Sequence, residues 1–350
     1  MTTVANGRPG VFCDEEGSFV IYSGAKKAVG IAASSVLGET GRVCRVRRIS
    51  DAALLFGLPE EGSVLTALCA MALQNGASEV AAVSAGPPGE TDYPTALAAL
   101  SEEALFALTC DSEDPAVHAL LSQSIKEASE AGRERIGAVS LEMGDGLEEW
   151  ASSFQNERLL LVCQQGETNG GETQPGCFLA AALLARLSAG SGPAEPAGGK
   201  ALEGVDRLAA PLTEEQIDGL IALGITPFEE RAGRVEIIRA VTSRTQTEGE
   251  EDASWRDLTT VLVSDDVLSS VRRALSLLPG AQNSAVSRRA VATQTALVLE
   301  EKRREGLLAS YRAPDVRADG DDPTLCVVTL DFTVAGGFHQ IVLSIRLESA

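Results

Sequence analysis

The fold is decided by residues 105–141, whose sequence is LFALTCDSEDPAVHALLSQSIKEASEAGRERIGAVSL. Leu105–Thr109 and Ile136–Leu141 are short apolar runs typical of buried strands. Between them, Pro115–Ala131 has its apolar residues at helical spacing and begins with a proline, as helices often do. A strand, a helix and a second strand in this order predict a βαβ unit with two parallel strands in one sheet.

The same alternation extends in both directions from this stretch. Further strands are predicted at Ala28–Ala33, Arg42–Val46, Val80–Val83 and Arg158–Cys163. Helices are predicted before Gly57 and at Ser63–Asn75, Tyr93–Leu100, 145–155 and Gly176–Leu187. The pattern predicts an α/β fold with a mainly parallel sheet and helices on its faces, which ends at the glycine- and proline-rich linker Gly190–Gly199.

The sequence after the linker has a different character, which predicts a mixed α+β region and makes the whole chain α+β. Thr213 to Gln216 has the pattern of a capping box at a helix start. Further strands and helices follow, and Asp265-Asp266 is expected to cap the first of these helices. The expected elements are the strand Val235–Val241, the helices Val267–Leu278 and Ser287–Tyr311, and the strands Leu325–Thr333 and Gln340–Leu347.

The composition argues against several classes of function. The 350 residues carry 29 basic and 50 acidic side chains, a formal charge of −21, and their basic groupings are short, so nucleic-acid binding is not expected. Seven scattered cysteines and two histidines argue against a metal site and favour reduced thiols, as in a bacterial cytoplasm. The N-terminus lacks a signal peptide pattern, no apolar run is long enough to cross a bilayer, and direct membrane insertion is not expected.

Cys177 is the strongest candidate for catalysis, because it lies at the start of an apolar helix, where the pKa of a thiol is lowered. It would need a base, and the two histidines are His118 and His339. A small buried cysteine is the competing interpretation. Two alternatives therefore stay open: an acyl-transfer-type α/β enzyme that uses Cys177, and a non-catalytic ligand-binding module. No cofactor is expected, because neither nucleotide-binding glycine pattern occurs.

Several motifs, in order, resemble those of one family. Arg8-Pro9-Gly10-Val11-Phe12 resembles an R-P-G-V-Y opening, and Val235–Thr245 resembles a V-x-I-x-R-x-x-T-T strand. Trp255-Arg256-Asp257-Leu258 with Asp265 resembles a W-x-x-L … D passage, and Leu223-Gly224-Ile225 precedes Thr226 where the family usually has Asn. Their order and spacing span nearly the whole chain. The chain therefore resembles the contractile phage tail sheath proteins, including those of phage-tail-like bacteriocins.

The resemblance implies a structural subunit and not an enzyme. Such a subunit polymerises as stacked rings, usually of six copies, around an inner tail tube protein, and contracts to drive the tube through a target cell envelope. Baseplate and tail terminator proteins would be further partners, and the protein would lie in a virion or phage-tail-like particle. Whether that particle is a phage, a bacteriocin or another contractile injection system stays open.

The resemblance also suggests a domain plan and two sets of functional residues. We expect residues 1–27 to be an extended arm that joins the inner domain, 28–204 an outer α/β domain, and 205–350 an inner assembly domain. Terminal strands that pair with neighbouring copies would use Val11, Phe12, Phe19, Val20, Ile21, Tyr22, Ile341, Leu343, Ile345 and Leu347. Cationic residues expected to face an acidic tube are Arg272, Arg273, Arg288, Arg289, Lys302, Arg303 and Arg304.

Overall fold

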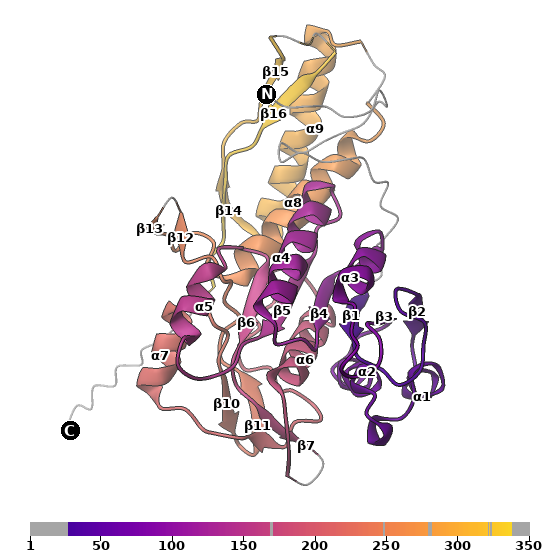
Figure 1. The fold of residues 1–350 in the computed structure, drawn as a ribbon. Coiled ribbons are helices and arrows are strands. Elements are labelled where there is room, and N and C mark those ends of the chain that lie inside the picture. The colour runs from indigo at the N-terminus through magenta and orange to yellow at the C-terminus, as the bar shows by residue number, and fades with distance from the viewer. Residues whose placement is uncertain are drawn as a thin grey trace, which may run out of the picture. The chain divides into compact units, whose positions relative to one another are not determined.

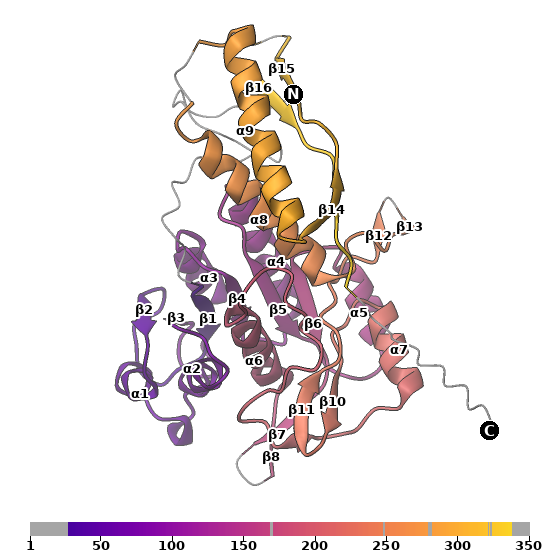
Figure 2. The same cartoon turned by 180° about the vertical axis from the view of Figure 1, so that it is seen from behind.

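The computed structural model describes residues 27–168, 171–247, 249–278, 282–320, 322 and 324–337. The chain divides into two compact units, the first ending at Pro279 and the second beginning at Gly280. Figures 1 and 2 show the elements of both units from opposite sides. The boundaries between arm, outer domain and inner domain stay a prediction.

A six-stranded sheet with the order β2-β3-β1-β4-β5-β6 forms the centre of the first unit. The four pairings from β3 through β1, β4 and β5 to β6 are parallel, and only the edge strand β2 runs antiparallel to its neighbour. The mainly parallel sheet predicted from the βαβ pattern is therefore confirmed. Its strands are β1 (Val29–Ala33), β2 (Val43–Val46), β3 (Val80–Ser84), β4 (Ala107–Cys110), β5 (Ile136–Ser140) and β6 (Leu159–Val162).

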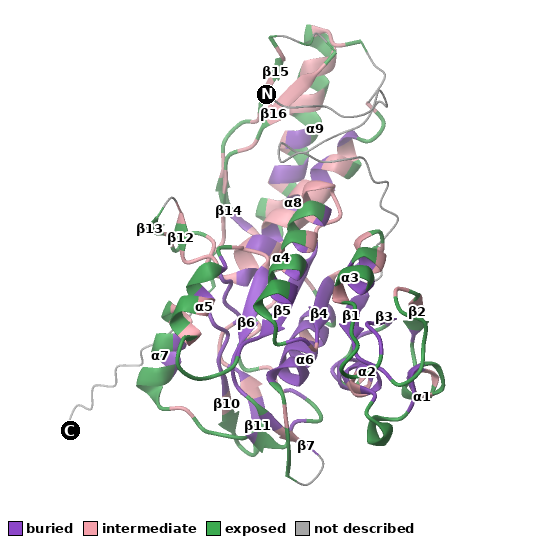
Figure 3. Ribbon diagram, in the orientation of Figure 1, coloured by how far each residue is buried: buried purple, intermediate pink, exposed green. Residues whose placement is uncertain are grey.

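The sheet is covered on both faces, and alternate residues of each strand enter different cores. Val29 and Ile31 of β1 pack with α1, α2 and α6, whereas Ala32 packs with the helices α3, α4, α5 and α7 of the other face. Figure 3 shows the central strands buried. The helices are α1 (Ile49–Phe56), α2 (Val64–Gln74), α3 (Tyr93–Ser101), α4 (Pro115–Glu130), α5 (Leu147–Ser153), α6 (Gly176–Ser188) and α7 (Glu214–Ala222).

Helix α6 is enclosed on nearly all sides. Every residue from Gly176 to Ser188 except Arg186 is buried, and many of them are alanines. Small side chains let α6 approach α2 and the strands β4 and β5 closely, as its contacts with them show. The predicted small-residue helix Gly176–Leu187 is therefore a central layer of the first unit.

Gly137 shows why the βαβ stretch needs a glycine in its second strand. A Cβ at this position would overlap Ile125 Cδ1 of α4 and lie 3.1 Å from the carbonyl oxygen of Leu108. A side chain here would therefore force Ile125 to repack and would crowd the Leu108 carbonyl. The apolar residues of α4 can pack onto the sheet because this strand position has no side chain.

Helix starts in the first unit follow the capping residues of the sequence. Asp114 accepts a hydrogen bond from the backbone N–H of Ala116 at 2.8 Å, and Pro115 occupies the first turn of α4. Thr213 and Gln216 form the predicted capping box at α7. In contrast, Asp265 caps nothing, because α8 begins at Leu258 and Asp257 is its N-cap residue. The expectation for Asp265-Asp266 was wrong.

Smaller elements complete the first unit. Residues 190–199 lie within this unit, and the backbone N–H of Gly199 donates to the carbonyl oxygen of Ile237 at 2.8 Å. The elements are η1 (Pro59–Glu61), β7 (Gly166–Thr168), β8 (Glu172–Gln174), β9 (Arg207–Leu208), β10 (Phe228–Arg231), β11 (Arg234–Ile237), β12 (Gln246–Thr247), β13 (Glu250–Glu251) and α8 (Leu258–Leu275).

The second unit has one long helix and two antiparallel strand pairs, β14 with β17 and β15 with β16. The helix predicted to reach Tyr311 ends at Arg304, because Gly306 has a φ of 78° and reverses the chain. The run predicted as one strand, Leu325–Thr333, forms two. The elements are α9 (Ala285–Arg304), β14 (Leu308–Tyr311), β15 (Asp315–Ala318), β16 (Cys326–Thr329) and β17 (Phe332–Val334).

Among the described residues, no single helix is long and apolar enough to cross a membrane, although Ile49–Glu61 and Val64–Gln74 meet the criteria of length and composition as a pair bent by 120°. The expected terminal strand residues lie outside the described part of the chain. They are Val11, Phe12, Phe19, Val20, Ile21, Tyr22, Ile341, Leu343, Ile345 and Leu347.

Candidate functional site

The last strand of the main sheet, β6, has its outer edge covered by irregular backbone from later in the chain. The carbonyl oxygens of Leu159 and Leu161 accept hydrogen bonds of 2.8 Å from the backbone N–H groups of Ser243 and Thr226. Just beyond β6, the Gln164 side chain donates to the Phe228 carbonyl and accepts from the Phe228 N–H, at 2.9 and 2.7 Å. With these groups occupied, the edge is blocked against addition of a further strand.

Thr226 holds together the two segments that cover β6. Its fully buried hydroxyl lies 3.2 Å from both the backbone nitrogen and the carbonyl oxygen of Val241. One hydroxyl can donate one hydrogen bond and accept another, so both backbone groups are satisfied. This is the position where the sequence has Thr in place of the Asn expected from the resemblance. Here the threonine satisfies the two backbone groups of Val241.

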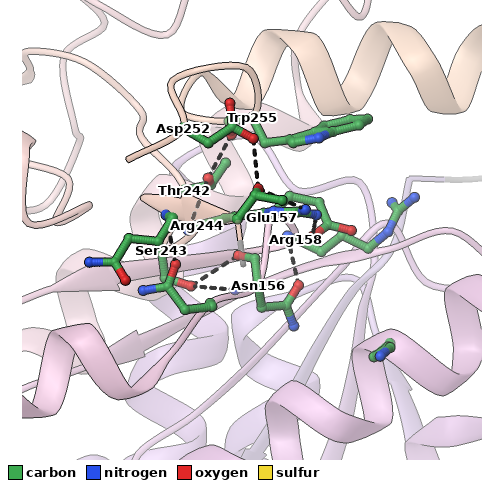
Figure 4. A network of polar contacts seen from close by, with 12 residues as sticks. Asn156, Glu157, Arg158, Thr242, Ser243, Arg244, Asp252 and Trp255 are labelled. Atoms are coloured by element: carbon green, nitrogen blue, oxygen red, sulfur yellow. Dashed lines mark hydrogen bonds and ion pairs between the residues drawn. The ribbon is translucent and has the colours of Figure 1, made fainter. Parts of the chain in front are cut away.

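A polar junction, which we define as residues 155–158 together with 242–247 and 249–257, joins the start of β6 to the chain that leads into α8 (Figure 4). At its centre, Ser243 Oγ donates to the carbonyl oxygen of Asn156 at 2.9 Å and accepts from the Asn156 N–H at 3.3 Å. The side-chain amide of Asn156 donates to Ser122 Oγ of α4 at 2.9 Å. The junction therefore ties three segments that are distant in sequence.

Arg244 extends the junction outward. Its guanidinium lies 3.1 Å from Glu157 Oε2 and 3.1 Å from Thr247 Oγ1, and 5.9 Å from the centre of the Trp255 ring. Thr247 Oγ1 in turn donates to Asp252 Oδ2 at 2.7 Å. Hydrogen bonds from Ser254 and Thr247 lower the pKa of Asp252 to about 2, so its carboxylate stays ionised and keeps accepting.

Arg158 anchors α8 through a bidentate ion pair. Its two terminal nitrogens lie 2.7 Å from the two carboxylate oxygens of Asp265, and both side chains are about 15% exposed. Burial raises the pKa of Asp265, and the Arg158 charge opposes that rise. A second pair, Arg272 with Glu134, connects the same helix to the residues before β5. Loss of one partner from such a pair leaves an uncompensated buried charge.

Among the described residues, the motifs at Val235–Thr245 and Trp255–Leu258 lie in or beside this junction, whereas Arg8–Phe12 lies outside the described part of the chain. Arg239 pairs with Asp257 at 2.8 Å, and Thr242 Oγ1 donates to the carbonyl oxygen of Trp255 at 2.7 Å. The threonine also accepts from the backbone N–H of Arg244 at 3.3 Å. The V-x-I-x-R-x-x-T-T and W-x-x-L passages therefore hold each other in place.

The other half of the junction could not be predicted from the sequence. Asn156, Glu157 and Arg158 form a polar triplet directly before an apolar strand, and this pattern is also typical of an ordinary solvated turn. Their partners lie 87 to 107 residues away in the chain.

The structure gives Cys177 no chemical activation. Burial raises the pKa of its thiol well above the ordinary value, and the nearby Asp111 and Cys110 raise it further. His118, the candidate base, is buried too. Its Nε2 lies 2.6 Å from the carbonyl oxygen of Ser112, and its ring stacks on Trp150. Within the described part of the chain, no group of three His, Cys, Asp or Glu residues could hold a metal ion.

The cationic residues expected to face a tube have varied surroundings. On α8, Arg272 forms an ion pair with Glu134, which precedes β5. Arg273 contacts Ser270 Oγ of the same helix at 3.3 Å. On α9, Arg288 donates to Asn283, while Arg289 is exposed. Lys302 pairs with Glu305, and Arg303 and Arg304 share Glu300. That these residues face a tube stays a prediction.

Residues 86–243 match a protein-family model described as the phage tail sheath protein central domain. No curated protein matches the chain. Among solved structures, the chain is similar to a sheath tail protein from Desulfitobacterium hafniense, with a TM-score of 0.71 and 11% identity over 91% of this chain and 100% of that one.

Two further similar structures come from contractile particles. One is the anti-feeding prophage helical sheath in its contracted state, with a TM-score of 0.72, 14% identity, and 99% and 100% of the two chains covered. The other is the contracted sheath complex of an extracellular contractile injection system, PVC, with a TM-score of 0.68, 16% identity and 99% of both chains covered.

Proposed function

We propose that this chain, whose residues 86–243 belong to the phage tail sheath family as its central domain, is a structural subunit of a contractile sheath. Copies would polymerise as stacked rings around an inner tube and contract to drive the tube through a target envelope. The observation that carries the proposal is the extension of the sheath fold over nearly the whole chain, beyond the central domain.

The chemistry of the site supports a mechanical role. Its polar groups are paired with one another through hydrogen bonds, and two largely buried ion pairs hold the middle and the last turn of α8 against the rest of the first unit. A subunit that moves as a rigid body during contraction needs such fixed joints inside each unit. The raised pKa of the Cys177 thiol makes the acyl-transfer alternative the weaker one.

The particle and its other components are part of the same proposal. The subunit would lie in a virion or a phage-tail-like particle, in rings of six copies, beside an inner tube protein, baseplate proteins and a terminator protein. Residues 28–204 would form the outer domain, and 1–27 with 205–350 the inner one. No cofactor is required, because contraction would release energy stored in the extended lattice at assembly.

The terminal strands are proposed to link neighbouring copies. Ile341, Leu343, Ile345 and Leu347 alternate with polar residues, a pattern that presents one face for burial. A strand at the end of a chain can pair with the sheet of another copy. Removal of the residues from Gln340 onward should leave the first unit folded and abolish tubes. Normal tubes from the truncated protein would contradict this proposal.

Contact with the inner tube is proposed for α9. Arg289 is exposed, and the side chains of Arg303 and Arg304 are 50% and 77% exposed, whereas Arg272 of α8 is buried against Glu134. Reversal of the charge at Arg289 and Arg304 should reduce co-sedimentation with the tube protein, most strongly at low salt. Lys126→Glu, at an exposed lysine on α4 of the first unit, is the matched control.

Electron microscopy of the purified full-length protein tests the main proposal. Regular tubes or stacked rings are the expected result at concentrations where helical assembly is favourable. Discrete globular particles under all assembly conditions, with or without the tube protein, would overturn it. The protein should also be denatured, refolded and imaged again. Tubes should return once the copies have refolded, because a sheath subunit assembles from folded copies.

A further inference from the structure

An exposed apolar patch lies at the end of α1. We define it as Val36, Leu37, Leu54, Leu55 and Leu58, of which Leu54 is 81% exposed. The backbone N–H of Leu37 donates to the carbonyl oxygen of Phe56 at 3.1 Å, which brings residues 36–37 against the end of the helix. These five residues are nearly half of the large hydrophobic side chains that the described chain exposes. Such clustering marks a contact surface.

Four arginines occur in the same stretch of chain as this patch, although the protein as a whole is strongly acidic. Residues 36–58 contain these four arginines and two acidic residues, and the exposed Glu60 and Glu61 follow just after Leu58. Arg45 and Arg47 pair with Glu79, whereas Arg42 is 71% exposed and contacts only Glu39, at 3.9 Å. Arg48 is exposed and has no side-chain partner within the described ranges. We call the patch and these arginines the α1–β2 surface.

The opposite end of the same sheet carries the complementary charge. Neither 136–157 nor 208–230 contains a basic residue. Helices α5 and α7 lie side by side beyond β6 in both views, on the far side of the sheet from α1 and β2 (Figures 1 and 2). We call this region the α5–α7 surface. Its exposed carboxylates include Asp145, Glu148, Glu149, Glu214, Glu215 and Asp218.

The α5–α7 surface also offers apolar contact. A cavity beside α5 is lined by Leu147 and Trp150 together with Glu142, Asp145 and Glu149. Leu147 and Trp150 are half-buried, and the neighbouring Met143 is 44% exposed. Apolar side chains among carboxylates are a suitable contact for an apolar patch with exposed arginines nearby.

We propose that the α1–β2 surface of one copy docks on the α5–α7 surface of the next copy. Two different surfaces form this contact, and they lie at opposite ends of one sheet, so each added copy presents the same free surface as the last. A contact of this heterologous type generates a ring or a helix and not a closed dimer. The inference rests on the proposed function, which brings copies side by side, and identifies where their first units meet.

Charge complementarity makes the second copy the favoured occupant. Arg42 and Arg48 are the exposed positive charges of the α1–β2 surface, and the α5–α7 surface of another copy offers them carboxylates without competing basic residues. The contact should weaken as salt rises, because charges at an exposed rim are screened beyond about 8–10 Å at physiological ionic strength. In a sheath, a weak lateral contact is multiplied over many copies, and it can break and re-form during contraction.

The first experiment reverses charges in the full-length protein. Arg48→Glu with Leu54→Glu should raise the critical concentration for tube formation about tenfold or more, since like charges would then face each other. Adding Glu148→Arg and Glu149→Arg to that variant should restore much of the loss. Leu120→Glu, at a leucine on α4 that is 45% exposed, is the control and should assemble normally. Unchanged assembly of the Arg48/Leu54 variant would overturn the proposal.

The second experiment does not depend on tubes. A photo-reactive amino acid at position 54 should cross-link to residues 142–153 or 214–218 of another copy, both in tubes and in concentrated dispersed protein. Cross-links confined to other regions, or none at all, would contradict the docking. If the protein forms no tubes but gives the expected cross-links, the sheath function fails while the docking stands. If tubes form without these cross-links, the reverse holds.

Discussion

The two edges of the main sheet are built in opposite ways. At β6 the edge is covered by backbone hydrogen bonds from Thr226 and Ser243 and is fixed by the polar junction and the Arg158–Asp265 pair. At β2, only one side of the strand is paired within the described chain, and the strand is short, flanked by arginines and followed by α1 with its exposed apolar residues. Both devices prevent uncontrolled strand addition. One edge is a fixed joint, and the other is available for a partner.

The largest expected effect comes from the fixed joint. Asp265→Ala removes one partner of a buried bidentate pair and should lower the free energy of unfolding by about 3–5 kcal/mol, since Arg158 keeps an uncompensated buried charge. Chemical denaturation of the dispersed protein measures it. Arg42→Ala, which breaks the exposed pair with Glu39 at the other edge, should cost less than about 1 kcal/mol. Equal losses would remove the distinction between the two edges.

A smaller loss is expected at the centre of the polar junction. Ser243→Ala should lower the free energy of unfolding by about 1–3 kcal/mol, because the N–H and carbonyl groups of Asn156 lose their partner. Ser50→Ala, at an exposed serine of α1, is the control and should change stability by less than about 0.5 kcal/mol. Thermal denaturation followed by circular dichroism would detect the difference.

The outer part of the junction should weaken in acid. The pKa of Asp252 is lowered in the folded protein to about 2, from an ordinary value of 3.8. A lowered pKa contributes stability that is present above the ordinary value and is lost as the pH falls through the folded one. Between pH 4 and pH 2, the wild type should therefore lose more stability than Asp252→Asn. Parallel pH profiles of the two proteins would show that Asp252 is not held by Thr247 and Ser254.

The smallest effect is expected on the apolar patch. Leu54→Ser should change the free energy of unfolding by no more than about 0.5 kcal/mol, because the side chain is 81% exposed and supports no core packing. Assembly of this variant should still be weaker. A large loss of stability in the dispersed protein would mean that Leu54 packs within its own unit and is not kept for a partner.

The fold was predictable where local pattern and tertiary structure agree. Short apolar runs and helical spacing identified the strands and helices of the sheet, and Thr213 with Gln216 identified a helix start. The end of α9 was missed because Leu307 to Tyr311 continues an apolar pattern that a helix and a strand can share. Gly306, with its positive φ, decides that the helix ends there.

The candidate site was predictable only in part. Its motif residues between Val235 and Asp257 were recognised by resemblance, but their partners Asn156, Glu157 and Arg158 were not. Hydrogen bonds across 87 or more residues leave no periodic trace in a sequence. Asp265 was assigned to a helix cap because an acidic residue before an apolar run usually has that role. That Arg158 lies opposite Asp265 is seen only in the structure.

Because α6 is enclosed, hydrogen exchange of its amides reports whether the first unit is folded. Because nearly every residue from Gly176 to Ser188 is buried, these amide protons can meet solvent only when the first unit opens as a whole. Hydrogen exchange at α6 should therefore follow global unfolding, while exchange at α1 follows local events at the exposed edge. A variant that assembles poorly but keeps slow exchange at α6 has lost a contact between copies, and one that exchanges quickly there has lost its fold.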